Sequence, residues 1–218
     1  MDAALLQIPL REVLHFLGWR GTPVDAPLLA QIRDLCDLAV REVRPRMAER
    51  RFPLAPDGSL AGTSMTPKGN DVRAMLAPCR EAVLLAATLG AESERLLLRM
   101  QAKDAAQALL LDAVLSAAIE AVLDAREEAL RRELAAQGRY LPDRFSPGYG
   151  DMPLAQMREI CEVLGAQRAI GLTVSAGGVM IPRKSVTAIL GISDVPVARR
   201  PAGCEGCAAR ETCALRRR

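Results

Sequence analysis

The strongest constraint on the fold of this chain is a long run, rich in alanine and leucine, that extends from Asp104 to about Ala136. The run predicts one continuous helix whose last third is dense with charge. Its first half, AAQALLLDAVLSAAIEAVLDA, is apolar nearly all round, and such a helix lies in a protein core rather than at a surface. Glu120 stands out as a carboxylate inside this apolar stretch. We therefore expect the first half of the helix to lie in the core of a folded domain.

Shorter elements are predicted on both sides of this helix. Helical spacing of apolar residues predicts further helices around residues 10–17, 25–45, 91–103 and 154–164. The apolar stretch 80–90 is typical of a buried strand, and the β-branched stretch 169–192 predicts two strands around Gly177–Gly178 and Pro182. Between residues 50 and 70, prolines and glycines interrupt every pattern, which predicts turns and a short β-hairpin. Helices mixed with a modest sheet indicate an α+β domain.

The composition excludes several classes of protein. Half of the 218 residues are apolar and a quarter are charged, as in ordinary globular chains. A net charge of +3 with only 3% aromatic residues does not favour nucleic acid as a partner. No stretch reaches the roughly 20 uninterrupted apolar residues of a membrane span, and charged residues come too early for a secretory signal. The scattered Cys36, Cys79 and Cys161 argue against a disulfide framework. We therefore expect a cytoplasmic protein that binds no membrane.

A loop rich in glycine and proline, GRYLPDRFSPGYGDMP, follows the long helix. In this loop Arg144 is followed, after three intervening residues, by the pair Gly148-Tyr149, and Pro153 comes four positions after Tyr149. Further on, the chain contains Gly-Leu-Thr at 171–173 and Met-x-Pro-x-x-Ser-Val at 180–186. These motifs, in this order and with a helix between them, resemble the reactivation domain of cobalamin-dependent methionine synthase, which binds S-adenosylmethionine. The resemblance extends over residues 109–192 and is weak before them.

The resemblance implies both a fold and a ligand site. The fold would be α+β and methionine synthase activation domain-like, with long helices packed on a small, twisted, mostly antiparallel sheet, over residues 1–198. The site for S-adenosylmethionine would be formed by Glu120, Arg144, Pro147, Gly148 and Tyr149.

The chemistry of these residues agrees with such a ligand. The planar guanidinium of Arg144 could clamp a carboxylate, and the carboxylate of Glu120 could neutralise an ammonium. The other interpretation is structural: Arg144 could pair with Asp143, Asp151 or Glu120 and only hold the loop in place. Tyr149 could be a packed aromatic, and Glu120 could face solvent.

Two departures from the family affect the expected role. After Gly-Tyr the fused enzymes continue Pro-Ala-Cys-Pro, whereas residues 150–153 here are Gly-Asp-Met-Pro, so the side chains that face the ligand or corrinoid differ. The chain also contains no corrinoid, folate or homocysteine module. The resemblance therefore implies a stand-alone reactivation partner, which would support reductive remethylation of cob(II)alamin on a cobalamin-dependent methionine synthase or another corrinoid protein. Cobalamin would come only through that partner.

A cysteine-rich tail is predicted for residues 199–218. Cys204, Cys207 and Cys213 form a Cys-x-x-Cys pair with a third cysteine close behind. This pattern predicts an iron–sulfur cluster or zinc, because two thiolates on one tight turn can reach the same metal. The alternative is a flexible tail with redox-sensitive thiols. Candidates for a fourth ligand are Cys161, His15, a carboxylate, solvent or a partner.

The tail suggests an alternative function. A cluster could deliver the electron that corrinoid reactivation requires, received from an electron donor protein. The chain would then be an iron–sulfur electron-transfer or corrinoid-activating module without S-adenosylmethionine binding. A third interpretation is a structural interaction subunit with zinc in the tail.

Overall fold

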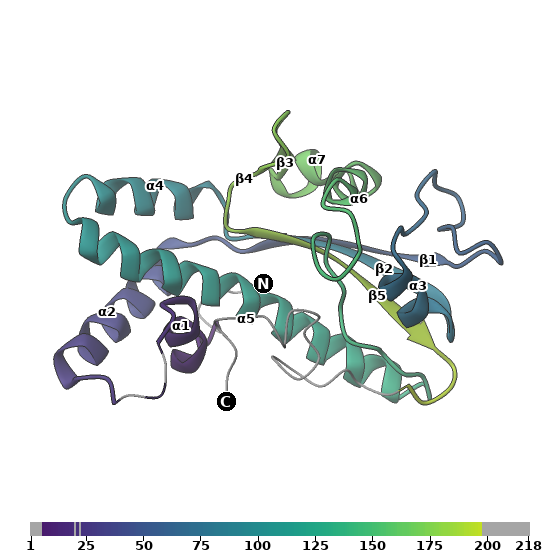
Figure 1. Ribbon diagram of the computed structural model, residues 1–218, viewed down its shortest axis with the longest axis horizontal. Coiled ribbons are helices and arrows are strands. Elements are labelled where there is room, and N and C mark those ends of the chain that lie inside the picture. Colours follow the sequence, from purple (N-terminus) through teal and green to yellow (C-terminus); the bar gives the residue numbers. More distant parts are fainter. Residues whose placement is uncertain (1–5, 20, 22, 198–218) are drawn as a thin grey trace.

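A computed structural model describes residues 6–19, 21 and 23–197. Its longest element is the 31-residue helix α5 (Ala105–Ala135), which runs beneath the sheet (Figure 1). The Asp104 carboxylate begins the helix by accepting hydrogen bonds from the N–H groups of Ala106 and Gln107, at 2.9 and 3.0 Å. The long helix predicted from the sequence is therefore confirmed.

Helix α5 is long and apolar enough to cross a membrane by length and composition alone, but 61% of its most apolar window is buried inside the protein. That degree of burial is typical of the core helix of a soluble domain. A cytoplasmic location stays a prediction.

A three-stranded antiparallel sheet lies across α5. Its strands are β1 (Arg46–Pro53), β2 (Cys79–Thr88) and β5 (Ser185–Ser193), in the order β1-β2-β5. Alternate residues of the central strand β2 face opposite cores: Val83 and Leu85 face α5, whereas Ala82 and Leu84 face the other side. Because both faces of β2 are covered, its sequence is a continuous apolar run rather than an alternating one.

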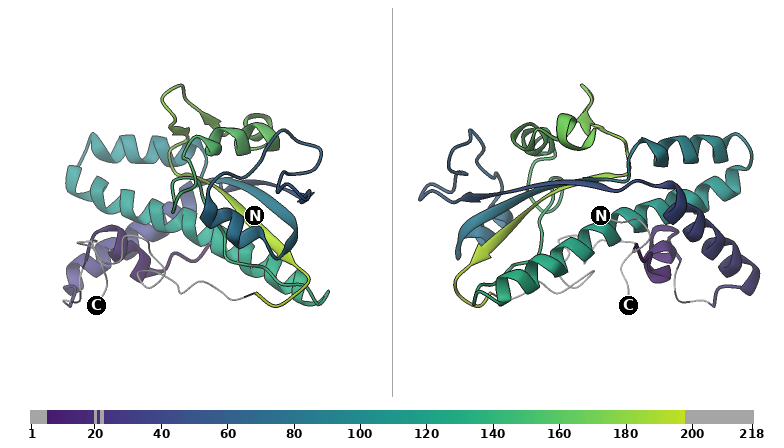
Figure 2. Two further views of the ribbon diagram at one scale, coloured as in Figure 1. Left: turned by 45° about the vertical axis from the view of Figure 1, so that its right-hand side comes forward. Right: turned by 180° about the vertical axis from the view of Figure 1, so that it is seen from behind.

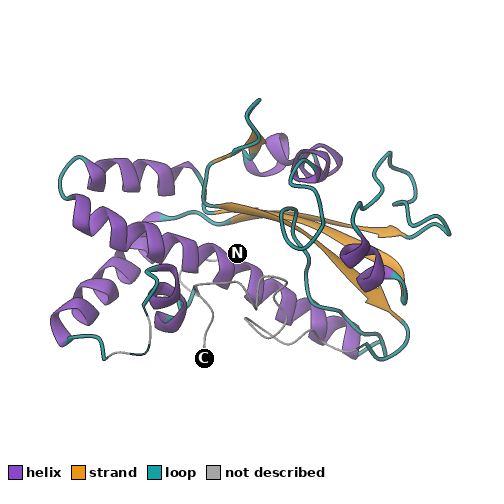
Figure 3. Cartoon of the chain, viewed as in Figure 1, coloured by secondary structure: helices purple, strands orange, loops and turns teal. Residues whose placement is uncertain are grey.

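Two groups of helices form the layers above and below the sheet (Figures 1 and 2). Three helices pack around α5: α1 (Leu10–Phe16) and α2 (Ala26–Glu42) lie below the sheet with it, whereas α4 (Ala91–Gln101) lies on the other side of α5, at the end of the sheet (Figure 1). The other face is covered by α3 (Asn70–Leu76), α6 (Gln156–Leu164) and α7 (Ala166–Ile170). Figure 3 shows how far helix exceeds strand in this arrangement. The α+β class is confirmed, with long helices on a small, mostly antiparallel sheet.

Several element boundaries differ from the sequence prediction. The stretch 169–192 holds three strands instead of two, because a short hairpin of β3 (Thr173–Val174) and β4 (Met180–Ile181) precedes β5. The prediction of turns from residue 50 onward was wrong for β1, whose sequence RMAERRFP has too many charged residues to look like a strand. Helix α3 was also not predicted. The division into a domain over 1–198 and a tail over 199–218 stays a prediction.

Candidate functional site

The chain returns from α5 along the outer edge of β5, and this return positions the predicted loop. Tyr140 exchanges backbone hydrogen bonds with Ser193 (2.8 and 2.9 Å), and Phe145 does so with Ile189 (2.8 Å each). The Phe145 side chain is buried in the core beneath α6. Successive residues of an extended segment point to opposite sides, so the neighbouring Arg144 faces α5.

Arg144 meets three carboxylates on α5. Its Nη2 donates to Glu120 at 2.8 Å, and its Nη1 donates to Asp124 at 2.6 Å and to Glu127 at 2.8 Å. The spacing of these acids, four and then three residues, places them on one face of the helix. Burial by itself lowers the pKa of Arg144, but the hydrogen bond with Asp124 and the charges of all three carboxylates outweigh it and raise that pKa above its ordinary value.

A second arginine extends this cluster. Arg131 donates to Glu127 at 2.8 Å and lies 3.9 Å from Asp143. Glu127 is therefore held between two guanidinium groups, and only 8% of it is exposed. Within the described part of the chain, the bonds of Arg144 use three of the five N–H groups of a guanidinium, which leaves the Nε–H and one Nη2–H for a further acceptor.

The tip of the loop is a tight turn. The Gly148 N–H donates to the Met152 carbonyl at 3.0 Å, and the Tyr149 N–H donates to the Ser146 carbonyl at 3.1 Å. Gly148 has a φ of +91°, a conformation that glycine adopts without strain. Pro147 is buried, whereas Tyr149 is 68% exposed, so its ring stands at the surface.

The residues that depart from the family pattern have structural roles here. The Asp151 carboxylate accepts hydrogen bonds from the N–H groups of Asn70 (2.6 Å) and Asp71 (3.0 Å) at the start of α3. These two bonds lower the pKa of Asp151. Met152 is buried in the core beneath α6. Both residues fasten the loop tip to the body of the protein.

The structure thus brings together part of the predicted set. Glu120 and Arg144 are in direct contact, which was one of the structural pairings considered for Arg144. Of the other two candidates, Asp151 binds the start of α3, and Asp143 lies 3.9 Å from Arg131. Tyr149 is not a packed aromatic, because its ring is exposed. The roles of Glu120, Arg144, Pro147, Gly148 and Tyr149 as ligand contacts stay predictions.

Asp124 and Glu127 were not predicted as partners of Arg144. Their distance along the chain from Glu120 could have revealed them, because residues four and seven positions apart share a helix face.

The downstream motif closes a turn into β5. The Ser185 hydroxyl donates to the Pro182 carbonyl at 2.7 Å, and Ser185 is buried.

The predicted metal ligands Cys204, Cys207 and Cys213 lie outside the described residues. Among the residues that are described, no three or more His, Cys, Asp or Glu side chains are arranged so that they could hold a metal ion. Burial raises the pKa of the Cys161 thiol to about 11, with a smaller contribution from the charge of Glu162. The iron–sulfur or zinc site stays a prediction.

Comparison with known proteins gives a likeness in structure only. No family model matches the chain, and no curated protein matches it. Among solved structures, the chain is similar to a crystal structure of the MetH reactivation domain bound to AdoHcy, with a TM-score of 0.63 and 17% sequence identity. The match covers 90% of this chain and 73% of that chain. The likeness shows that the two share a fold.

Proposed function

We propose that this protein binds S-adenosylmethionine at the loop Arg144–Tyr149 and supports reductive remethylation of cob(II)alamin on a separate corrinoid partner. The partner would be a cobalamin-dependent methionine synthase or another corrinoid protein. The observation that carries the proposal is that three carboxylates of α5 fix Arg144 in place while two of its N–H groups are left for a further acceptor. The resemblance implied that Arg144 and Glu120, 24 positions apart, serve one ligand.

The structural likeness supports the choice of ligand. The similar MetH domain was crystallised with AdoHcy, which is S-adenosylmethionine without its transferable methyl group. Both molecules carry a carboxylate and an ammonium. The two unused N–H groups of Arg144 suit the carboxylate, because charge-assisted hydrogen bonds to a guanidinium are short and strong.

The acidic side chains around Arg144 suit the positive end of the ligand. Arg144 and Arg131 face Glu120, Asp124 and Glu127, and Arg131 also contacts Glu128. Within this group the carboxylates outnumber the two guanidinium groups, and the excess would attract an ammonium and a sulfonium.

The tyrosine at the loop tip would meet the partner or the adenosine. Its ring is exposed and amphipathic, so it can pack against a flat group and hydrogen-bond through its hydroxyl. When bound, S-adenosylmethionine would supply the methyl group, and a donor outside the described residues would supply the electron. The residues of this chain would position the ligand and contribute no proton transfer.

The test is a calorimetric titration of S-adenosylmethionine into the purified protein and into an Arg144→Ala variant. Loss of a charge-assisted hydrogen bond should weaken binding by about tenfold to a hundredfold. The matched control is Arg126→Ala, which removes an arginine of α5 that also has carboxylate partners, Glu49 on β1 and Glu133 on α5, away from the loop. Its affinity should equal that of the unmodified protein.

Absence of binding to the folded, unmodified protein would refute the methyl-donor role. In that case the alternative, an iron–sulfur electron-transfer or corrinoid-activating module, would be tested on anaerobically purified protein. A brown protein with thiolate-to-iron absorption would support that alternative, and a colourless one would exclude it.

A further inference from the structure

Glu127 is the most deeply buried of the three carboxylates that meet Arg144. Its side chain is 10% exposed, compared with 32% for Glu120 and 62% for Asp124. With so little surface of its own, Glu127 is the least able of the three to touch a ligand. Burial of a carboxylate also costs free energy unless its partners replace the lost water. The partners of Glu127 therefore indicate what it does.

Each oxygen of Glu127 binds a different arginine. Its Oε2 accepts a hydrogen bond from Nη1 of Arg144, and its Oε1 accepts one from Nη2 of Arg131, both at 2.8 Å. Arg131 lies one helical turn further along α5, on the same face of the helix. Because both oxygens are engaged, the carboxylate cannot turn without breaking a charge-assisted bond. Glu127 therefore ties the arginine of the loop to a fixed point on the long helix.

The bonds of Arg144 leave one part of its guanidinium group open. Asp124 and Glu127 both accept from Nη1, so both N–H groups of that nitrogen are engaged. Glu120 accepts from Nη2, so within the described part of the chain one N–H of Nη2 and the N–H of Nε remain for a further acceptor. A guanidinium can bind one carboxylate through two parallel hydrogen bonds. The direction in which the remaining N–H groups point depends on how firmly Nη1 is held.

Of the two partners of Nη1, Glu127 gives the firmer hold. Asp124 is exposed, and an ion pair in contact with water contributes little to stability. Glu127 is shielded from water, and Arg131 holds it from its other side. The orientation of the Arg144 guanidinium therefore depends mainly on Glu127.

We propose that Glu127 is a positioning residue of the S-adenosylmethionine site. Held by Arg131, it fixes the Arg144 guanidinium so that the N–H groups of Nε and Nη2 meet the carboxylate of the ligand, and it does not touch the ligand itself. This role rests on the proposed function and accounts for how the site is ordered before the ligand arrives. An arginine that is already fixed loses less conformational freedom on binding, so the affinity is higher.

The first measurement is a calorimetric titration of S-adenosylmethionine into the full chain and into Glu127→Gln. The amide keeps the shape of the side chain but can accept hydrogen bonds at only one of its two ends, so binding should weaken by about tenfold. The matched control is Glu133→Gln, because Glu133 also lies on α5 and also contacts two arginines, Arg126 and Arg51, away from the loop. The control should bind like the unmodified chain.

Two comparisons separate positioning from a simple effect of charge. Decarboxylated S-adenosylmethionine keeps the ammonium and the sulfonium but offers Arg144 no carboxylate, so Glu127→Gln should weaken it much less than it weakens S-adenosylmethionine. Arg131→Met removes a positive charge, which by Coulomb attraction alone would strengthen the binding of a ligand with a net positive charge. Because Arg131 holds Glu127, we expect this variant to bind S-adenosylmethionine more weakly instead.

The second measurement needs no ligand. The Nε–H signal of Arg144 in ¹⁵N-labelled protein, identified by its loss in Arg144→Ala, reports the picosecond-to-nanosecond motion of the guanidinium. We expect a high order parameter in the unmodified chain and in Glu133→Gln. A lower one is expected in Glu127→Gln and in Arg131→Met. Thermal unfolding would establish that each variant is folded at the temperature of the measurement.

The positioning role is overturned if Arg144 has the same order parameter in Glu127→Gln as in the unmodified chain. It is also overturned if Glu127→Gln binds S-adenosylmethionine like the unmodified chain, or weakens both ligands equally. A failure of the proposed function has a different signature: the unmodified chain then does not bind S-adenosylmethionine, whereas Arg144 still loosens in Glu127→Gln. That outcome would count against the methyl-donor role alone and leave Glu127 as the residue that orders Arg144.

Discussion

The replacement of Gln156 by methionine tests how the 54–69 loop is held to the body of the protein. Gln156 is buried at the start of α6 and makes three hydrogen bonds: to the Lys68 N–H, the Thr66 carbonyl and the Glu159 carboxylate. Methionine has a similar length but can replace none of them. The variant therefore removes the polar link between loop and helix while it keeps most of the packing.

The expected cost follows from the number of bonds. A hydrogen bond contributes a net 0.5–1.5 kcal/mol or so, and the three together about 2–3 kcal/mol. The hydrogen bond from the Lys68 N–H is only partly buried, so the freed N–H can bind water and does not add the full penalty of a buried donor. For a chain of this size such a loss corresponds to a fall in Tm on the order of 5–10 °C.

Urea unfolding measured by circular dichroism gives the free energy of unfolding, and hydrogen exchange reports on the Lys68 amide. The control is Gln167→Met, at an exposed position on α7, which should change stability by less than about 0.5 kcal/mol. The Lys68 amide should exchange faster in Gln156→Met than in the unmodified protein. A stability loss below about 0.5 kcal/mol, with an unchanged exchange rate, would refute the idea that Gln156 holds the loop.

Three further predictions concern the rest of the molecule. Glu127→Gln should lower the free energy of unfolding by about 1–3 kcal/mol, because it weakens the buried bonds to two arginines. The control, Glu128→Gln at an exposed position, should cost less than about 0.5 kcal/mol, and equal effects of the two variants in urea unfolding would contradict the prediction. Asp151 has a folded pKa below its unfolded value, so its stabilising contribution is present above about pH 4 and is lost as the pH falls through the folded pKa. Asp151→Asn should therefore flatten the acid limb of the stability curve, measured between about pH 2 and pH 5, and an unchanged limb would argue against the bonds to α3. Leu115→Ala should lower the free energy of unfolding by about 2–5 kcal/mol, because Leu115 is fully buried in α5. Leu109, on the same helix, is 66% exposed, so Leu109→Ala should leave thermal unfolding nearly unchanged. An unchanged stability in Leu115→Ala would mean that α5 is not the core helix.

The elements that could be predicted are those whose apolar pattern is visible within one continuous stretch of the sequence. Helix α5 is long and continuous with a first half that is apolar nearly all round, and β2 is an uninterrupted apolar run from Ala82 to Ala87. Each pattern has few alternatives, because a fully apolar segment of either kind must be covered on all sides.

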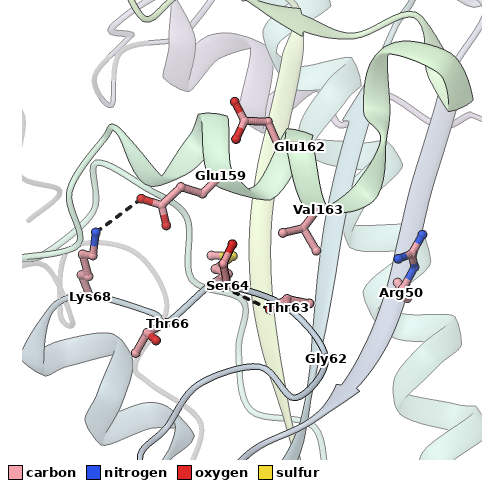
Figure 4. Close-up of a pocket in the computed structure, with 10 residues that line it drawn as sticks. Arg50, Gly62, Thr63, Ser64, Thr66, Lys68, Glu159, Glu162 and Val163 are labelled. Carbon is pink, nitrogen blue, oxygen red and sulfur yellow. Dashed lines mark hydrogen bonds and ion pairs between the residues drawn. The ribbon is translucent and has the colours of Figure 1, made fainter.

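Strand β1 could not be predicted because half of its side chains are charged and most are exposed, so its sequence shows no apolar pattern. Phe52 is its only buried residue, while Glu49 and Arg51 pair with charged residues of α5 and Arg50 lines a hollow between the 54–69 loop and α6 (Figure 4). The charges that make β1 look like a loop in the sequence are satisfied by distant parts of the chain.

The candidate site was predicted in part. The resemblance placed Glu120 and Arg144 in one site, and helix periodicity could have added Asp124 and Glu127. Which carboxylates meet Arg144, however, depends on where the loop crosses the edge of β5, and the bridge between Phe145 and Ile189 sets that crossing.

The sequence by itself determined the α+β class, the central helix and the motifs that suggest a ligand. Only the tertiary structure decided that Arg144 is held by three carboxylates, that Asp151 fastens the loop to α3 and that Gln156 joins the 54–69 loop to α6. The physical reason is distance along the chain. Periodicity reports which face of an element is buried and depends on residues a few positions apart. The partner of a polar side chain is chosen by the packing of whole elements, here across 17 to 90 positions of the sequence.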